Sequence, residues 1–304
     1  MNMVEQSKEL TISLAQAKAQ SKQRLRVRRL IRTHAFSALV YLLLISGALI
    51  FMAPFLWMVS TSLKLPKNVF TFPPQLIPNP AYWSNYPDGW ARLNFTRFTV
   101  NTLIITLNNV LADTLVSSVV AYSFARLRAP GKDFLFMLVL ATMMVPLEVT
   151  RVPLYILFSK LGWVNTLLPL TVPSWFGWPF FIFLMRQFFA TIPYDLDDAA
   201  RMDGCSTFGI WWRIILPLAK PALAAVAIFS FVANWNDFQG PLLYLSDINN
   251  YTLAIGLHML QGGRFIFIHQ VMAVSVLSVV PILVIFFSAQ RYFIQGVTLS
   301  GIKG

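Results

Sequence analysis

Long apolar runs, separated by shorter polar segments, make up most of this chain. A helix that spans a membrane needs about 20 consecutive, mostly apolar residues. The runs that approach this requirement are Phe36–Met58, Phe98–Ala125, Phe134–Leu147, Leu161–Met185, Pro221–Ser246 and Gln270–Gln290. The third run is the shortest, and the acidic residues inside the runs are Asp113 and Asp237. The pattern predicts an all-α, polytopic membrane protein with about six transmembrane helices.

The composition agrees with a membrane protein. Only 12% of the residues are charged and 57% are hydrophobic, and the mean hydropathy is +0.63, whereas soluble domains carry about 25% charged residues. The net charge of +12 lies in the N-terminal tail and in short loops between apolar runs, which is typical of membrane proteins. We therefore expect no nucleic-acid partner. Cys205 is the only cysteine, which excludes an intrachain disulfide and paired-cysteine metal motifs.

The distribution of lysine and arginine predicts the orientation. An even number of spans places both termini on the same side of the membrane, and most basic residues lie on that side. Because basic loops favour the cytoplasm, we expect both termini and the loop after the fourth span to be cytoplasmic. Residues 1–33 are then a basic cytoplasmic tail, and residues 34–304 are the transmembrane domain. The basic run Lys22–Arg32 is expected to fix the topology and to contact anionic membrane lipids.

Two loops are expected on the opposite side. The segment Thr61–Arg97 combines several aromatic residues with prolines, and such a segment favours an ordered structure. It either caps the helices at the membrane surface or docks an external partner. The second loop, near Asp247–His269, contains Gly262 and Gly263, which predict a hinge-like turn.

A polar stretch, DLDDAARMDGCSTFGIWWRIILPLAKP (195–221), interrupts the apolar pattern. Its first residues are rich in aspartate, which complements the dipole at the start of a helix. Asp197 and Arg201 are four residues apart and can pair. Gly204 can take the left-handed conformation that ends a helix. These features predict a short helix over residues 195–203.

A second element follows at once. Ser206 can cap the next helix, and the apolar residues Phe208, Trp211, Trp212 and Ile215 recur at helical spacing. They predict a stripe that lies in the membrane interface. The short helix before it would then be held at the membrane surface. It either docks into a groove of another protein or is an ordinary capped loop in solvent.

This stretch resembles the cytoplasmic motif of the inner-membrane permeases of binding-protein-dependent ABC importers. That motif reads Glu-Ala-Ala, three residues, Gly, nine residues, Ile, one residue and Leu-Pro. The matching positions here are Asp198, Ala199, Ala200, Gly204, Ile214, Leu216 and Pro217, with Arg201 and Asp203 inside the motif. Asp198 stands where the family usually has glutamate. The resemblance implies that these residues form a coupling helix, which sits in a cleft of a cytoplasmic ATPase.

Two further segments are similar to carbohydrate permeases of that family, namely Asn234–Leu242 and the C-terminal end from Gln290. The resemblance implies the permease subunit of an ATP-driven importer for a sugar or polyol in a bacterial or archaeal inner membrane. The implied partners are a cytoplasmic ATPase dimer, a second permease subunit and an extracytoplasmic solute-binding protein. The sequence contains no phosphate-binding loop of the Gly-x-x-x-x-Gly-Lys-Ser/Thr kind. We therefore expect a subunit that is not an enzyme, needs no cofactor and relies on a separate ATPase.

Several polar residues inside the spans are candidates for the solute path. Buried ionisable residues in membranes are costly and often functional. The candidates are Asn109, Asp113, Asn234, Trp235, Asn236 and Asp237. They either line the path or form hydrogen bonds between helices. The alternative function is a secondary transporter driven by an ion gradient, in which Asp113, Glu148 or Asp237 relays protons. The three histidines are scattered along the sequence, so we expect no metal site.

Overall fold

The computed structural model describes residue 34 and residues 36–262 and 267–301. The predicted basic tail and Gly263 of the predicted turn lie outside these residues. The chain divides into two compact units, 1–58 and 59–304, and the boundary falls inside the helix Phe36–Ser62. The following description concerns the second unit, which contains the candidate site.

The described residues are helical, with no strand in 36–262 or 267–301. The α-helices of the second unit are α2 (Asn85–Arg92), α3 (Phe95–Arg126), α4 (Lys132–Thr142), α5 (Leu147–Lys160), α6 (Leu168–Thr171), α7 (Pro179–Thr191), α8 (Asp195–Met202), α9 (Thr207–Ile210), α10 (Leu216–Leu218), α11 (Lys220–Trp235), α12 (Gln239–Tyr244), α13 (Leu253–Gln261) and α14 (Ile268–Gly301). Short 3₁₀ turns cover Pro66–Asn68, Val172–Phe176 and Ile248–Asn250, and Trp211–Ile215 is π-helical.

The helices agree with an all-α membrane protein. By length and composition, four helices among the described residues can cross a membrane, and the number rises to six if two bent helix pairs count as one span each. The four are Phe36–Ser62, Phe95–Arg126, Leu168–Thr191 and Ile268–Gln290. The fourth predicted span is therefore displaced toward the C-terminus, because residues 161–167 form turns in place of a helix.

The third and fifth predicted spans are not single helices. The third is replaced by α4 and α5, which bend by 93° at a short break. Pro146 lies in that break, and proline both lacks an N–H group and disfavours a helical residue before it. In the fifth predicted span, Pro221–Ser246, α11 ends at Trp235 and the separate helix α12 follows. The predicted length of that span was wrong because apolar composition alone does not reveal a helix end.

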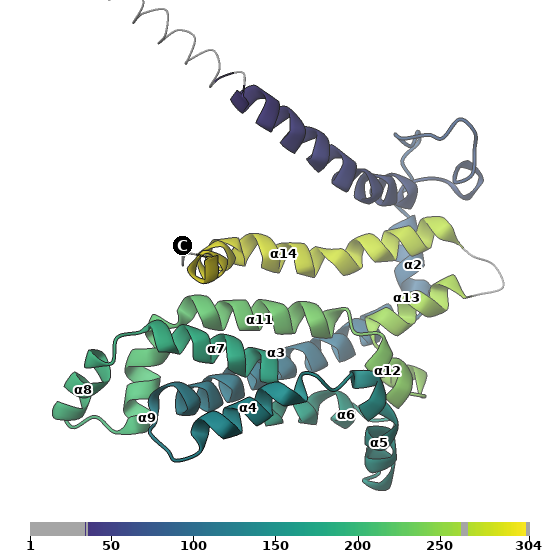
Figure 1. Cartoon of the computed structure of the whole chain (residues 1–304). Coiled ribbons are helices and arrows are strands. Elements are labelled where there is room, and N and C mark those ends of the chain that lie inside the picture. Colours follow the sequence, from purple (N-terminus) through teal and green to yellow (C-terminus); the bar gives the residue numbers. More distant parts are fainter. Residues whose placement is uncertain (1–33, 35, 263–266, 302–304) are drawn as a thin grey trace, which may run out of the picture. The chain divides into compact units, whose positions relative to one another are not determined.

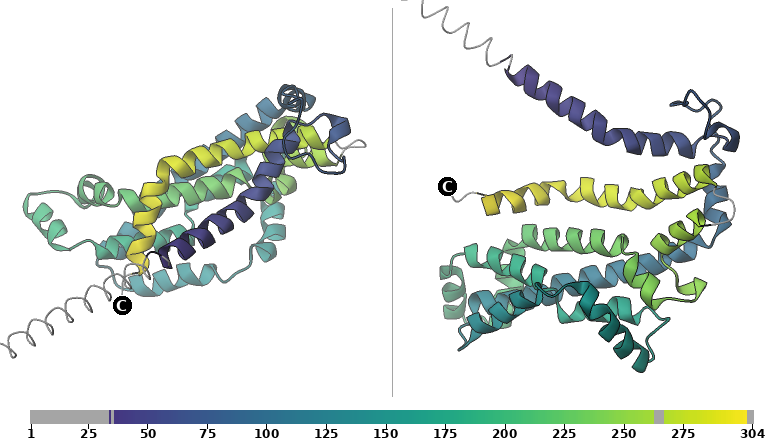
Figure 2. Two further views of the ribbon diagram at one scale, coloured as in Figure 1. Left: turned by 90° about the horizontal axis from the view of Figure 1, so that it is seen from above. Right: turned by 45° about the vertical axis from the view of Figure 1, so that its right-hand side comes forward.

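Helix α3 is the central element of the second unit. It packs against α7 and α11, and α14 packs on the other side of α11 (Figure 1). Its 32 residues correspond to a length of about 48 Å. Figure 2 shows the long helices running side by side, with α8 and α9 beyond one end of the bundle. The ends of α3 therefore lie far apart.

Two apolar clusters fill the bundle, one near each end of α3. The first surrounds Phe95 and Phe98 at the start of α3 and includes Trp235 of α11. The second surrounds Ala121, Tyr122 and Ala125 near the end of α3, and its partners are Phe181, Met185, Phe189, Ala200, Ile210, Trp211, Ile215 and Val226. Between them, the buried face of α3 is polar. The middle of the bundle is thus held by hydrogen bonds and its ends by apolar packing.

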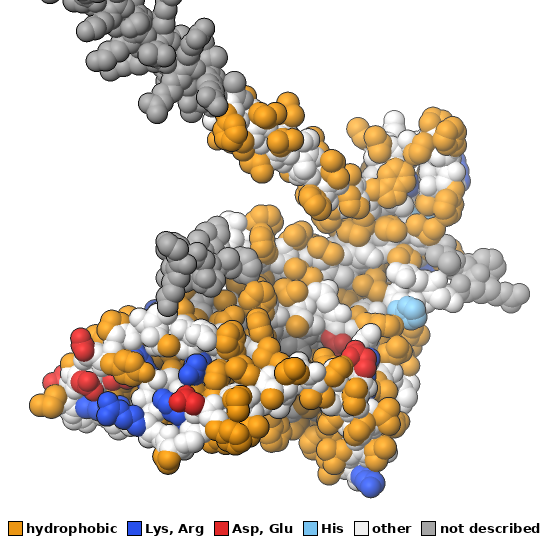
Figure 3. Space-filling view, in the orientation of Figure 1, with side chains coloured by type: hydrophobic (Ala, Val, Ile, Leu, Met, Phe, Trp, Pro, Cys, Tyr) orange, Lys and Arg blue, Asp and Glu red, His pale blue; other side chains and the backbone are white. Residues whose placement is uncertain are grey.

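The surface separates apolar from charged regions. Apolar side chains cover α4 and α5, and charged side chains gather around α8 and α9 (Figure 3). The exposed residues Leu138, Val149 and Val152 are examples of the apolar region. A surface of this kind suits contact with lipid in its apolar part and with water or another protein in its charged part.

The loop after the first span is tied to α2. The Asn85 side-chain amide donates hydrogen bonds to the backbone oxygens of Ser62 and Lys64, both 2.8 Å away. Farther along, Phe70, Phe72 and Ile77 are exposed. Capping of the bundle and docking of an external partner both stay predictions for this loop.

We predict that Gly256→Ala destabilises the bundle. A Cβ atom at Gly256 of α13 would overlap the buried ring of Phe98 in α3, and such overpacking costs about 1–3 kcal/mol. The measurement is the thermal unfolding midpoint of the purified protein in detergent. Gly47→Ala is the matched control, because no atom lies within 4 Å of the added Cβ there. Equal midpoints for both variants would refute the close contact of α13 with α3.

Candidate functional site

Helix α8 begins where its sequence predicts and ends one residue earlier than predicted, at Met202. It begins at Asp195 with acidic residues in its first turn. Gly204 follows it with a φ of 80°, in the left-handed region. The Gly204 N–H donates to the Arg201 oxygen at 3.0 Å and the Cys205 N–H donates to the Ala200 oxygen at 2.9 Å. These two bonds form a Schellman motif, which requires glycine because of the positive φ and not for lack of space.

The next element is only partly as predicted. The Ser206 hydroxyl caps α9 by accepting a hydrogen bond from the Gly209 N–H at 3.1 Å. The prediction that the four apolar residues of this element form one stripe in the membrane interface is wrong. Trp211 and Ile215 are buried in the protein, whereas Phe208 and Trp212 are exposed. The π-helical turn Trp211–Ile215 explains the difference, because its wider spacing rotates side chains away from the α-helical positions.

Helix α8 presents two different faces. Asp197 and Ala200 are buried against the bundle. The opposite face exposes Asp198, Ala199, Arg201, Met202 and Asp203. Met202 is 88% exposed. Of the remaining motif residues, Ile214 and Leu216 pack partly against the apolar cluster, and Pro217 is exposed.

The buried face of α8 is joined to the end of α3 by an ion pair. The Nε atom of Arg126 lies 3.7 Å from the Oδ2 atom of Asp197, and the two side chains are 0% and 1% exposed. The predicted partner of Asp197 was Arg201, and that prediction is wrong. Arg201 pairs with Asp198, at 3.3 Å. The reason is that Asp197 points into the bundle, while Arg201 lies on the solvent-facing side of the helix.

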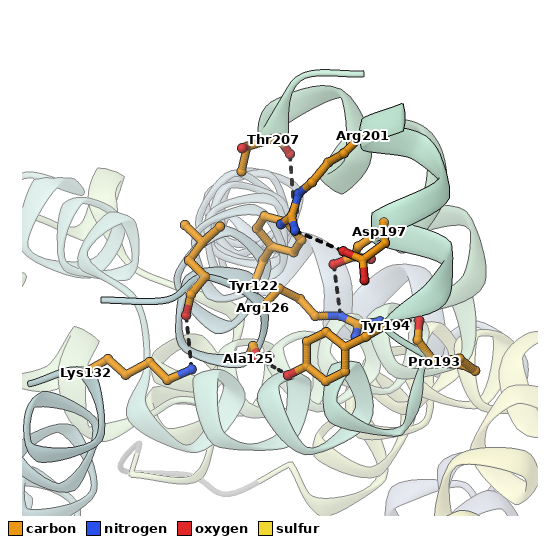
Figure 4. Close-up of polar contacts among 11 residues, drawn as sticks. Tyr122, Ala125, Arg126, Lys132, Pro193, Tyr194, Asp197, Arg201 and Thr207 are labelled. Carbon is orange, nitrogen blue, oxygen red and sulfur yellow. Dashed lines mark hydrogen bonds and ion pairs between the residues drawn. The ribbon is translucent and has the colours of Figure 1, made fainter. Parts of the chain in front are cut away.

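Tyr194 completes this junction (Figure 4). The Arg126 guanidinium lies over the Tyr194 ring, with its Cζ atom 4.4 Å from the ring centre. The Tyr194 hydroxyl donates to the Ala125 oxygen at 2.7 Å, and Arg126 donates to the Pro193 oxygen at 3.4 Å. Removing one member of a buried ion pair costs about 3–5 kcal/mol, because the other charge is left without a partner. The junction therefore joins α8 to α3, and the Arg126–Asp197 contact within it is an ion pair without a hydrogen bond.

Three of the six path candidates come together in the middle of the bundle. Asn109 of α3 donates to the Leu170 oxygen of α6 at 2.8 Å and to the Asn234 side-chain oxygen of α11 at 2.6 Å. One turn away, Asp113 accepts a hydrogen bond from the Ser230 hydroxyl at 2.6 Å. Asn109 and Asp113 are both buried. This polar cluster connects α3, α6 and α11.

The other three path candidates lie apart from the polar cluster. Trp235 is buried, and its indole N–H donates to the Ser278 oxygen of α14 at 3.0 Å. Asn236 is exposed and bonds only within its own helix end, to the Val232 oxygen. Asp237 accepts a hydrogen bond from the Gly240 N–H at 3.1 Å. Trp235 thus has no free aromatic face in this structure, and Asp237 shapes the turn into α12.

Sequence reasoning missed Arg126, Tyr194 and Ser230. Ser230 is four residues before Asn234, so it shares a helix face with that candidate, and this spacing could have revealed it. Arg126 was counted only as a loop charge, although it follows directly on an apolar span. Within the described residues, no three histidine, cysteine, aspartate or glutamate side chains gather in a way that could hold a metal ion.

The fold and the exposed short helix define a polytopic helical membrane protein of the transport class. The family model described as the binding-protein-dependent transport system inner membrane component matches residues 114–299. The chain belongs to this family, whose members are the permeases of ABC importers. The matched range includes α8 and the whole motif around it.

The similar proteins agree with that family. The arabinooligosaccharides transport system permease protein AraQ of Halalkalibacterium halodurans is 40% identical over 207 residues, 67% of this chain and 73% of the relative. The sn-glycerol-3-phosphate transport system permease protein UgpE of Yersinia pestis is 32% identical over 265 residues, 84% of this chain and 94% of the relative. A solved bacterial ABC transporter involved in the import of the acidic polysaccharide alginate shares the fold, with a TM-score of 0.75, 23% identity and coverage of 86% of this chain and 97% of that chain.

We predict that Asn234→Val loosens the polar cluster. The substitution removes the acceptor for Asn109, and hydrogen bonds between membrane helices contribute about 0.6–1.7 kcal/mol. The measurement is the thermal unfolding midpoint in detergent, and a lower midpoint is expected. Asn236→Val is the matched control, because Asn236 bonds only within its own helix end. An equal shift for both variants would refute the bridging role of Asn234.

Proposed function

We propose that this permease forms half of the transmembrane path of an ATP-driven importer for a sugar-like solute. The family membership supports ATP-driven import over transport driven by an ion gradient. The names of the relatives support the solute class, because they specify arabinooligosaccharides, melibiose with raffinose and stachyose, and sn-glycerol 3-phosphate. The other half of the path is a second permease subunit. A solute-binding protein delivers the solute from outside the cell.

The exposed face of α8 is the proposed docking site for the ATPase. This single feature carries the proposal, because it leaves Met202 exposed on a helix that is held firmly on its other side. Ala199 and Gly204 are small, so a groove of the ATPase can approach the backbone closely. Asp198 and Asp203 add negative charge that complements a basic groove. Asp198 is shorter than the glutamate that is usual in the family, so its partner must come nearer to the helix.

The proposed orientation follows from charge. The residues around α8 and the loop after α3 are rich in arginine and lysine, and such loops favour the cytoplasm. The ATPase then meets α8 on the cytoplasmic side, where ATP is available. Closure of the ATPase dimer on ATP draws the docked helices together and switches the path between its inward and outward openings. Membrane lipids cover the apolar surface over α4 and α5.

The polar cluster is the proposed centre of the solute path. Asn109, Asn234 and Asp113 offer amide and carboxylate groups suited to hydroxyl groups of a sugar. In this structure those groups bond to one another across three helices. Solute contact then requires a path state in which α11 or α6 moves relative to α3. Among the six path candidates, Asn236 is the one amide that is exposed, so it could meet a solute without such a movement.

We predict that ATPase docking responds to side-chain volume at Gly204. Apart from its two chain neighbours, no atom of the described residues lies within 4 Å of a Cβ placed there, so a steric effect beyond the backbone strain must come from a partner. Gly204→Asn adds volume, and asparagine tolerates the left-handed conformation better than most residues. We expect the substitution to lower the amount of ATPase that co-purifies by about tenfold, which corresponds to a loss of about 1.4 kcal/mol in binding free energy.

The matched control is Gly131→Asn. Gly131 precedes α4 with a φ of 75° and also has no atom within 4 Å of an added Cβ, so the backbone strain is comparable. Gly131→Asn should retain the ATPase. Normal retention and normal solute uptake with Gly204→Asn would contradict the docking role of α8.

We also predict the composition of the native complex. Gentle purification of this chain from its own membranes should yield an ATPase and a second six-span permease in stoichiometric amounts, which mass spectrometry can identify. A chain that elutes alone and transports solute into vesicles without ATP would contradict the importer and would favour the secondary transporter.

A further inference from the structure

We infer that the buried pair Arg126–Asp197 is the joint that makes α8 and α3 move as one body during the transport cycle. The inference rests on the proposed function, because it assumes that the ATPase pulls on α8. It concerns a different face of that helix, the one turned away from the ATPase. The joint consists of Arg126, Asp197 and Tyr194.

The two charges of the joint are buried. Neither side chain has access to solvent, and no other charged group forms an ion pair with either of them among the described residues. Two charges in such a place are stable only while they face each other. Separating the two side chains would leave each charge buried without a counter-charge, so the pair opposes any movement of α8 away from the end of α3.

Further contacts surround the joint. The Tyr194 ring lies against the guanidinium and its hydroxyl reaches the backbone of α3 at Ala125. Farther along, the Tyr122 hydroxyl of α3 donates to the Thr207 oxygen at the start of α9 at 3.3 Å. Both ends of the segment that carries α8 are therefore bound to the last two turns of α3. A rotation of α8 alone would separate Asp197 from Arg126, while the contacts of Tyr194 and Thr207 hold the segments before and after α8.

Helix α3 connects the joint to the polar cluster. The helix is continuous from Arg126 back to Phe95 and carries Asn109 and Asp113 of the polar cluster. A displacement of α8 that is passed to Arg126 thus reaches the middle of the bundle through one rigid helix. Close packing around the joint, with Ala125 and Ala200 buried beside it, leaves little room for the displacement to be absorbed.

The test is Asp197→Asn in the complete importer, reconstituted in proteoliposomes. The variant keeps the shape of the side chain but leaves Arg126 without its counter-charge. The exposed face of α8 is unchanged, so the ATPase should bind in wild-type amount and hydrolyse ATP. We expect the number of solute molecules transported per ATP hydrolysed to fall by about tenfold. Asp197→Glu, which retains the charge, should restore most of the wild-type ratio.

Asp133→Asn is the matched control. Asp133 pairs with Arg186 at 3.8 Å and joins α4 to α7, but the Asp133 side chain is 81% exposed and does not touch α8. Exposed ion pairs contribute little, so its ratio of transport to hydrolysis should change by less than about twofold. A purely structural role for Asp197 would reduce the yield of complex and leave the ratio per complex unchanged, and that result would overturn the inference.

A milder variant keeps the test decisive if Asp197→Asn does not fold. Tyr194→Phe removes only the hydroxyl that bonds to Ala125. Its ratio of transport to hydrolysis should fall by about two- to fivefold, since one neutral hydrogen bond is lost, and an unchanged ratio would overturn the inference. If the wild-type chain retains no ATPase, the proposed function itself fails and the joint fails with it. Retention of the ATPase with a wild-type ratio in Asp197→Asn overturns the joint alone.

Discussion

The requirement that buried polar groups find partners inside the protein determines how this bundle is arranged. Helix α3 carries such groups along its whole length, and several of them bind neighbouring elements. Asn109 binds α6 and α11, one oxygen of Asp113 binds α11, and Arg126 pairs with Asp197 of α8. The other Asp113 oxygen and the hydroxyls of Thr106 and Ser117 have no hydrogen-bond partner among the described residues. In an apolar membrane an unpaired group of this kind costs several kcal/mol. The positions of three elements around α3 are therefore specified by chemistry, and apolar packing fills the space between them.

This arrangement gives one helix two tasks. The middle of α3 contributes to the proposed solute path, and its end holds the helix on which the ATPase is proposed to act. Asp113 marks the first region and Arg126 the second. They are 13 residues apart along one helix, which corresponds to about 20 Å. No flexible segment lies between them, because α3 continues without a break to Arg126. Coupling over that distance needs only a rigid helix and a firm joint, with no change of secondary structure.

Local signals in the sequence were sufficient for short-range features and failed for long-range ones. The start of α8, the left-handed Gly204 and the Ser206 cap follow from residue types within a few positions, and the structure confirms them. The predicted pairing of Asp197 with Arg201 was wrong. Helical spacing identifies possible partners only within the same helix, whereas Arg126, the actual partner, is 71 positions earlier. The burial of Trp235 depends on packing partners that hydropathy does not identify. The bend between α4 and α5 coincides with Pro146, a local signal that the hydropathy pattern passes over. The functional roles of the motif and of the path residues stay proposals.

The central claim is that the exposed face of α8 contacts an ATPase. The most direct measurement is photo-crosslinking in native membranes from a benzoylphenylalanine placed at Met202, compared with the same group at Phe72. Both positions are highly exposed, at 88% and 94%, but Phe72 lies in the loop predicted on the opposite side of the membrane. The account predicts that Met202 captures a nucleotide-binding ATPase and that Phe72 does not. An active importer in which Met202 captures no ATPase would contradict the claim.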